Sequence, residues 1–262
     1  MTYMKVHRTL LSCAILAIGF RLGAQQAAVV EFEVASIKPN KSNTNSSGIH
    51  HSHGLWRANN NTVKSLIINA FEVLPEQIAG APPWIDSDRF DIEAKYEENS
   101  SASNADNSKQ TQLRLQALLS DRFKLQIHRE TKEWQSYVLV AGKKGPKLAP
   151  TEKKEGSSMN SNNGHMECKG VTIENLARNL AFRLGRPVVN ETALEGRFDF
   201  TLDFEPEGPA RIGEKDNPIA GVDARKPSLF TAVQDQLGLK LESRKAPVEM
   251  LVVDRIERPS DN

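Results

Sequence analysis

The sequence is poor in cysteine. Its 262 residues contain two cysteines, and Cys13 lies in an N-terminal segment predicted to be removed, which leaves Cys168 as the single thiol of the mature chain. A single thiol cannot form an intramolecular disulfide, so stability must come from packing. Cys168 could act as a nucleophile, but its place in the predicted short strand HMECKG favours a half-buried structural thiol.

An excess of charge of either sign is also absent. The formal net charge is +1, and the loss of Lys5, Arg8 and Arg21 with the N-terminal segment takes it to −2. Nucleic-acid-binding proteins usually carry a basic face, so this class is disfavoured. Aromatic residues make up only 6% of the chain, so the core must be built from Leu, Ile, Val and Ala.

Catalytic signatures and long apolar runs are missing as well. The sequence contains no G-x-S-x-G, H-E-x-x-H or G-x-G-x-x-G motif and no P-loop. After residue 24 no stretch is long and apolar enough to span a bilayer. We therefore predict no membrane span in the mature chain.

Residues 1–24 have the pattern of a secretory signal peptide. Lys5, His7 and Arg8 form a basic start, an apolar run from Leu10 to Phe20 follows, and small residues precede a cleavage point after Ala24. An uncleaved anchor is the alternative, but the apolar run is too short to span a membrane. We expect an exported protein, periplasmic or extracellular.

The stretch 171–204 has a related counterpart earlier in the chain. Thr172, Ile173 and Leu176 correspond to Thr62, Val63 and Leu66, and RFD at 197–199 corresponds to RFD at 89–91. FKLQIHRE at 123–130 and LKLESRKA at 239–246 follow at similar distances, so the segments indicate an internal duplication.

Each copy is predicted to contain a strand, a helix, a strand, a second helix and a hairpin. Apolar side chains at helical spacing predict amphipathic helices at 63–74 and 173–184. The fold class is therefore α+β, with two tandem copies of a strand-helix-strand-helix-hairpin unit and helices packed on a mostly antiparallel sheet.

The predicted hairpins close each copy. In the first, 123–130 pairs with 134–141; in the second, Leu239 to Arg244 pairs with Val248 to Ile256, and Pro247 marks the turn.

The domain prediction follows from the repeats. After the signal peptide at 1–24, residues 25–141 form the first α+β unit with a leading strand. Residues 142–163 form a polar linker rich in Gly, Lys, Ser and Asn, and residues 164–262 form the second unit.

A series of motifs covers nearly the whole mature chain: FEVASIKPN, TVKSLIINAF, GAPPWIDSDRFDIEAK, GRPVVNETALEGRFDFTLDF and QLGLKLESRKAPVEMLVVDRIERPSDN. In their order they resemble a family of uncharacterised exported proteins of soil bacteria, of acidobacterial type, defined by a domain of unknown function. The resemblance implies no known catalytic site. In some relatives similar domains are joined to membrane-anchored sensor peptidases, which implies extracytoplasmic sensing or binding.

The second unit contains the segments IENLARNLAFRLGRPVV and SLFTAVQDQLGLKLE. They are similar to the small module at the N-terminus of secretins and TonB-dependent receptors. This similarity implies protein binding.

Three histidines, His50, His51 and His53, are the candidate metal ligands, because neighbouring imidazoles can share a transition metal. They end a Ser/Asn loop without a nearby acid, which favours solvent-exposed side chains. His165 and Cys168 could add ligands if the two repeat openings met in space.

The other candidates favour structural roles. Asp86, Asp88 and Asp91 have a spacing that could suggest calcium, but they lack the glycine and terminal glutamate of a calcium loop. Asp91 matches Asp199, which indicates a repeated turn or strand-edge bond. Trp56, Trp84 and Trp134 could line a glycan groove, but core packing or cover of a hairpin is favoured.

The favoured function is an exported, non-catalytic binding or sensing module of the cell envelope, with no cofactor and an unknown ligand. Its partner would be an envelope protein or an extracytoplasmic ligand, and we expect no nucleic acid. The terminal hairpin is the candidate surface, because an exposed strand edge can accept a partner strand. The alternative is an exported metal-dependent hydrolase that uses the histidines.

Overall fold

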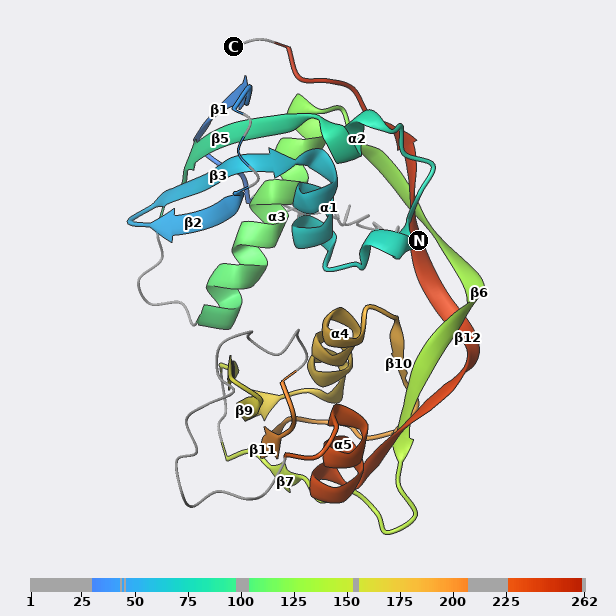
Figure 1. The fold of residues 1–262 in the computed structure, drawn as a ribbon. Coiled ribbons are helices and arrows are strands. Elements are labelled where there is room, and N and C mark those ends of the chain that lie inside the picture. Colours follow the sequence, from blue (N-terminus) through green and yellow to red (C-terminus); the bar gives the residue numbers. More distant parts are fainter. Residues whose placement is uncertain are drawn as a thin grey trace, which may run out of the picture.

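The computed structural model describes residues 30–42, 44, 46–97, 104–152, 156–206 and 226–260. The predicted signal peptide at 1–24 lies outside these residues. Within them the chain is a mixed α+β protein with mostly antiparallel sheets. Figure 1 shows two lobes, stacked one above the other and joined along one side by a ribbon of two long strands. No helix in the described part is long and apolar enough to cross a membrane.

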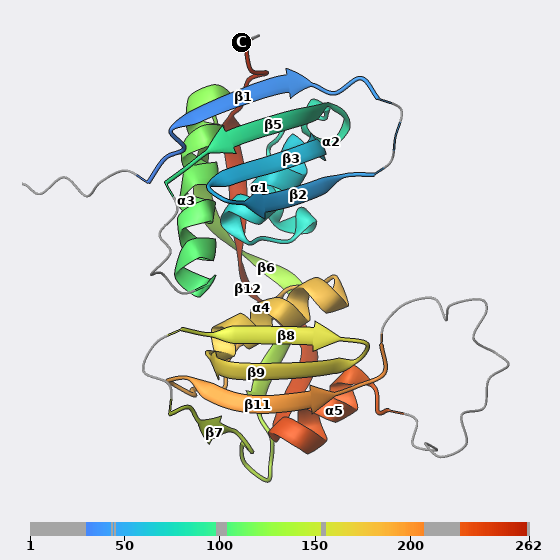
Figure 2. The same ribbon diagram turned by 90° about the vertical axis from the view of Figure 1, so that its left-hand side faces the viewer.

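Lobe 1 is built on sheet A, whose strand order is β1-β5-β3-β2 with antiparallel neighbours. One face of the sheet is covered by helices, and the other is open in Figure 2. The sheet and its main helices are β1 (Val34–Pro39), β2 (Gly48–Ser52), β3 (Leu55–Thr62), β5 (Arg89–Lys95), α1 (Val63–Phe71) and α3 (Asn104–Arg122). The short connecting elements are η1 (Pro75–Gln77), β4 (Ile78–Ala79) and α2 (Trp84–Ser87).

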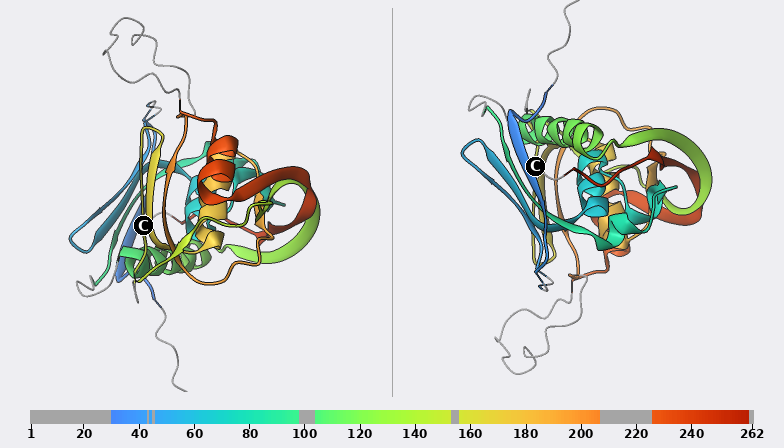
Figure 3. Two further views of the ribbon diagram at one scale, coloured as in Figure 1. Left: turned by 90° about the horizontal axis from the view of Figure 1, so that it is seen from below. Right: turned by 90° about the horizontal axis from the view of Figure 1, so that it is seen from above.

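Lobe 2 is built in the same way on sheet C, with the strand order β7-β11-β9-β8. Its strands are β7 (Ala149–Pro150), β8 (Ser158–Asn162), β9 (His165–Val171) and β11 (Phe198–Asp203). Its helices are α4 (Ile173–Leu184) and α5 (Leu229–Leu237), and the short strand β10 (Val188–Asn190) follows α4. Figure 3 shows that in both lobes the helices lie between the sheet and the ribbon.

The ribbon consists of β6 (Gln126–Ala141) and β12 (Leu239–Arg255), which pair antiparallel from end to end. Because the strands run in opposite directions between the lobes, each strand contributes to both cores. Leu139 and Leu241 are buried in the core of lobe 2, whereas Leu251 and Val253 are buried in the core of lobe 1. The end of β6, from the first predicted unit, therefore packs into the core of lobe 2. The end of β12, from the second unit, packs into the core of lobe 1.

Two short strands extend the ribbon into a four-stranded sheet, sheet B. β10 pairs parallel with β6 through Val189 and Val138, and β4 pairs parallel with β12 through Ala79 and Val252. Each short strand thus covers the part of the ribbon that belongs to its own lobe.

The two predicted hairpins are wrong. Residues 123–141 and 239–256 contain the expected strands, but each pair is continuous and its halves pair with the other long strand. The reason lies at the predicted turns. Thr131-Lys132-Glu133 contains no Gly, Asn or Asp to adopt positive φ, and Pro247 lies within β12 opposite Glu133. A strand accommodates the proline φ, so β12 continues through it.

The predicted linker at 142–163 is not entirely loop. Its residues form β7 and also β8, which pairs with β9 through a tight turn at Asn163 and Gly164. Both turn residues have positive φ, 44° and 72°, as the two-residue turn between twisted strands requires. His53 and Gly54 form the corresponding turn between β2 and β3, with φ of 46° and 71°. Composition did not predict β8, because four of its five side chains are polar and its pairing with β9 is made by the backbone.

The predicted helices are present, and both begin at a threonine cap. The hydroxyls of Thr62 and Thr172 each accept a hydrogen bond from the backbone N–H three residues on, both at 3.2 Å. The predicted apolar stripes are buried in the two cores. The first helix ends at Phe71, three residues early, because Glu72 adopts a left-handed conformation with φ of 53°.

Candidate functional site

The three candidate metal ligands lie at one edge of lobe 1. His50 and His51 belong to the edge strand β2, and His53 lies in the following turn; all three are exposed. His50 lies opposite Arg57, a cation that opposes metal binding. Partial burial and the neighbouring His50 lower the pKa of His51. Among the described residues, no group of three His, Cys, Asp or Glu side chains is placed to hold a metal ion.

The two residues proposed to complete that site lie in lobe 2. His165 and Cys168 are on β9, and their side chains point to opposite faces of sheet C, since His165 is exposed and Cys168 is only 1% exposed. Burial raises the pKa of Cys168 to about 12, so its thiolate is scarcely populated at neutral pH. Cys168 is a structural thiol of the lobe 2 core.

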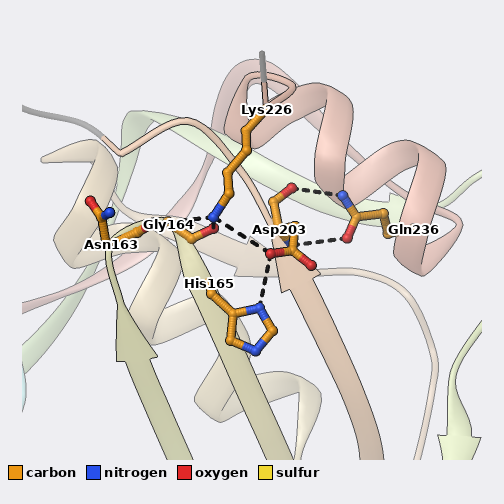
Figure 4. A network of polar contacts seen from close by, with 6 residues as sticks. All are labelled: Asn163, Gly164, His165, Asp203, Lys226 and Gln236. Atoms are coloured by element: carbon orange, nitrogen blue, oxygen red, sulfur yellow. Dashed lines mark hydrogen bonds and ion pairs between the residues drawn. The ribbon is translucent and has the colours of Figure 1, made fainter. Parts of the chain in front are cut away.

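His165 belongs to a polar network at the end of β9 and β11, drawn in Figure 4. Its Nδ1 lies 2.8 Å from Oδ1 of Asp203, and Lys226 Nζ lies 3.6 Å from the same oxygen. Gln236 on α5 donates to the Asp203 carbonyl at 2.7 Å and accepts from the Asp203 N–H at 2.9 Å. Hydrogen bonding from His165 holds the pKa of Asp203 below its ordinary value.

This network anchors helix α5 to the sheet. A carboxylate that orients an imidazole is found in catalytic triads, but a triad also needs a nucleophile within hydrogen-bond reach. Cys168 cannot serve here, because it is buried on the opposite face of β9. Lys226 donates instead to the carbonyls of Asn163 and Gly164, both at 3.2 Å, and so fixes the β8–β9 turn.

A second histidine is held between carboxylates on the ribbon. Nδ1 of His128 lies 2.8 Å from Asp254, and its Nε2 lies 3.1 Å from Glu130. The hydrogen bond that His128 donates to Asp254, and then the one to Glu130, raise the pKa of His128. The group lies on the open surface of β6 and β12.

The three aspartates of the calcium-like spacing point to three different partners. Asp86 pairs with Lys64, and Asp88 pairs with Arg258. Asp91 accepts the backbone N–H of Asn60 at 2.8 Å and the side chain of Asn40 at 2.8 and 2.9 Å. They do not form a calcium site.

The repeated structural role predicted for Asp91 and Asp199 is confirmed. Asp199 accepts the N–H of Gly170 at 2.6 Å, as Asp91 accepts that of Asn60, and both donors have positive φ. The preceding arginines complete the clamp. Arg89 donates to the Asn60 carbonyl and Arg197 to the Gly170 carbonyl, both at 2.8 Å. Between them, Phe90 and Phe198 are buried in the two cores.

The three tryptophans do not share a groove. Trp56 is buried in the core of lobe 1, and Trp84 packs at its margin with the guanidinium of Arg258 over its ring. Trp134 is partly exposed on the ribbon, where it lies opposite Ala246.

A cavity with a volume of about 610 Å³ lies between the lobes. We call it the inter-lobe cleft. Its walls are α3 of lobe 1 and β8 and α4 of lobe 2, and the polar uncharged side chains that line it include Ser108, Gln112, Ser158, Asn160, Asn175 and Asn179. An ion pair between Glu72 and Arg178, at 2.6 Å, joins the lobes beside it.

The same ion pair borders a second cavity of about 290 Å³, which reaches the ribbon at Val248. A further cavity of about 500 Å³ surrounds Asn40, Asp88 and Arg258, but it lies within lobe 1 and its principal charges pair with each other. The inter-lobe cleft and the 290 Å³ cavity are both lined by residues of the two lobes, and the cleft is the larger of the two. Sequence reasoning missed it, because its walls are far apart in the chain and its residue types resemble those of ordinary loops.

The family comparison covers most of this architecture. A family model described as "Protein of unknown function (DUF3738)" matches residues 64–256, well over half of the chain. The chain belongs to the DUF3738 family. The comparisons with curated proteins and with solved structures give no significant match.

The range matched by the DUF3738 model includes the inter-lobe cleft but not the three candidate metal ligands. It runs from α1 to the end of β12 and contains every residue that lines the inter-lobe cleft. His50, His51 and His53 precede the matched range.

Proposed function

We propose that this DUF3738 protein is an exported, non-catalytic binding module of the cell envelope, and that its ligand binds in the inter-lobe cleft. The observation that carries the proposal is a cavity of about 610 Å³ whose walls come from both lobes. Ligand sites commonly have volumes of about 300–1,000 Å³ and lie between domains. Export rests on the signal-peptide pattern of residues 1–24.

The construction of the molecule supports binding between the lobes. Beside the cleft, Glu72 and Arg178 connect the end of α1 with α4 through an ion pair that is partly open to solvent. Such a pair contributes at most about 1 kcal/mol. A ligand that contacts both lobes can therefore change their separation at modest cost, while the ribbon keeps them together.

The distribution of titratable groups favours binding over hydrolysis. Catalytic sites concentrate groups with shifted pKa values in a cleft. Among the described residues, those with shifted pKa values lie outside the inter-lobe cleft, and the two imidazole–carboxylate groups lie on open surfaces. The similarity of 164–262 to the N-terminal module of secretins and TonB-dependent receptors also supports a binding role.

The proposal includes a duplicated origin for the two lobes. Supporting features are the threonine-capped helices, the positive-φ hairpin turns and the paired Arg-Phe-Asp clamps. An exchange of long strands between two ancestral copies would produce the observed ribbon.

A cross-linking experiment tests binding in the cleft. Lys109 on α3 and Asn160 on β8 line opposite walls, so cysteines at these positions can be bridged by a bis-maleimide. Cys168 does not interfere, because it is buried and its pKa is raised to about 12. The matched control is the same variant capped with a monofunctional maleimide.

Both samples are incubated with the small-molecule fraction of an envelope extract and examined by native mass spectrometry. We expect the capped control to retain a bound species and the bridged protein to lose it. Equal retention by both would place binding outside the cleft, and no bound species in either would refute the proposal.

A further inference from the structure

We infer that the ligand of the inter-lobe cleft is a neutral oligosaccharide, an inference that rests on the proposed function and adds its substrate class. Three independent features of the cleft lead to this class: unpaired amides and hydroxyls, a balance of charge, and an exposed aromatic ring.

The first feature is the supply of unused polar groups. Within the described residues, the side chains of Gln112, Ser158, Asn160 and Asn175 make no hydrogen bond to protein, and three of the four are only partly exposed. An amide presents a donor and an acceptor side by side. A pair of adjacent sugar hydroxyls offers the complementary acceptor and donor.

The second feature is the charge of the cleft. Glu72 and Arg178 neutralise each other at 2.6 Å, which leaves Lys109 as the remaining charged side chain among the described lining residues. One cation does not provide the multiple contacts that polyanion binding requires. The lining therefore fits an uncharged ligand better than a nucleic acid or a strongly acidic peptide.

The third feature is an exposed aromatic ring beside the amides. Phe182 on α4 lines the cleft and is 45% exposed. Asn175, Arg178 and Phe182 follow each other at helical spacing and so share one face of α4. The C–H groups of a sugar ring can pack on such an aromatic face while its hydroxyls reach the amides.

An extended peptide is the main competing ligand, because β8 is an edge strand of sheet C and lines the cleft. A peptide added to that edge would pair with the backbone of β8. It would leave the side-chain amides of Asn175 and Gln112, on α4 and α3, unpaired in a ligand-filled cleft, which is unfavourable. A ligand with hydroxyls on several sides satisfies all the walls.

Calorimetric titration of the mature protein with neutral hexasaccharides tests the inference. The probes are cellohexaose, xylohexaose, laminarihexaose, maltohexaose and chitohexaose. We expect at least one to bind with a stoichiometry of one, and its affinity to change by less than about twofold when salt is raised tenfold, since a neutral ligand releases few counterions.

Variants locate the site. Phe182→Ala and Asn175→Ala should each weaken binding by at least about tenfold. The matched controls lie on α5, outside the cleft: Phe230→Ala removes a ring that is 38% exposed, and Gln234→Ala removes an exposed amide. Both controls should bind as the parent does. Circular dichroism checks that all four variants remain folded.

Equal weakening by site and control variants would overturn the inference. So would the failure of all five sugars, or a bound species from the envelope extract that proves to be a peptide. If the sugars fail but the bridged protein still loses an extract-derived ligand, binding in the cleft stands and the oligosaccharide class is wrong. If both experiments fail, the proposed function fails with it.

Discussion

Asp91 and Asp199 show how a single carboxylate can fix a strand irregularity. Each accepts the N–H of a residue with positive φ, Asn60 or Gly170, at a point where the pairing register of its strand shifts. The sequence predicted this shared role because RFD recurs. It could not supply the partners, since the acceptor and its donor come from different strands.

Replacement of Asp199 by alanine should lower the free energy of unfolding by about 1–3 kcal/mol, because the Gly170 N–H loses its acceptor. Asp91→Ala should also destabilise the fold, because the Asn60 N–H and the Asn40 side chain lose their acceptor. Urea unfolding measures both. Asp235→Ala, on the exposed side of α5, is the control and should change stability by less than about 0.5 kcal/mol. Equal effects of all three would contradict the clamp.

His128 and His51 should titrate on opposite sides of the ordinary histidine value of 6.5. Hydrogen bonds to Asp254 and Glu130 raise the pKa of His128, whereas burial lowers that of His51. Protonated His128 therefore favours the folded state below about pH 6.5, and this contribution is lost as pH rises through its raised folded pKa. For His51 the folded state is disfavoured as pH falls below 6.5.

Ring-proton NMR titration of the folded protein measures the two values. His128→Gln identifies its resonance and should remove the higher titration. If His128 titrated at or below 6.5, its two carboxylate partners would not be engaged in solution.

At the level of elements, the caps and apolar stripes of the helices were readable from sequence because they depend on neighbours along the chain. For the long strands, the sequence predicted the strand conformation but not the pairing partners. Their residues alternate as strands do, yet the choice between a local hairpin and pairing with a distant strand depends on turn geometry. Thr131 to Glu133 offers no residue suited to a tight turn, and that absence was the available signal. Pro247 led to the wrong prediction of a turn, because proline is common in turns and also occurs at strand positions that need no backbone N–H.

Proline at Val252 should destabilise lobe 1. Had β12 been the free edge of a hairpin, this change would have affected only the capture of a partner. Val252 instead pairs with His128 on one side and with Ala79 on the other, so the strand is interior to sheet B at this point. Loss of its N–H and distortion of the ladder should cost about 2–4 kcal/mol. Thermal melts followed by circular dichroism measure it.

Val252→Ala keeps the backbone and is the matched control; it should cost about 1 kcal/mol. Indistinguishable melts for the two variants would show that β4 does not hold this part of β12.

At the scale of the molecule, the inter-lobe cleft could not be predicted, because it follows from long-range pairing. Glu72 and Arg178 are separated by 106 positions and meet only once the ribbon has set the lobes side by side. The lining residues on α4 belong to a helix that was predicted from its apolar stripe, and those on β8 belong to the predicted polar linker, so neither segment indicated a cleft. The signal, four polar side chains that make no hydrogen bond to protein, exists only in three dimensions.

Neither half of the chain should fold alone. A fragment of residues 25–143 lacks Leu251 and Val253, and a fragment of 144–262 lacks Leu139, all of which are buried in the opposite core. Each fragment should show little fixed structure by NMR, whereas co-expression should yield a folded one-to-one complex. A fragment of 25–143 that gave a dispersed spectrum by itself would contradict the role of β12 in lobe 1. Urea unfolding of the intact chain should be a single transition for the same reason.

The ribbon of β6 and β12 also determines when each lobe can finish folding. The core of lobe 1 contains both Ile37 and Val253, so its closure must wait for nearly the entire chain and join segments far apart in sequence. Such contacts form slowly, because the loop between them must be closed first. A chain threaded N-terminus first through a membrane, as the proposed export requires, would emerge with neither lobe able to finish until its last strand arrived. In such an export, delayed closure would leave both lobes unfinished during passage, and the arrival of β12 would allow folding on the far side.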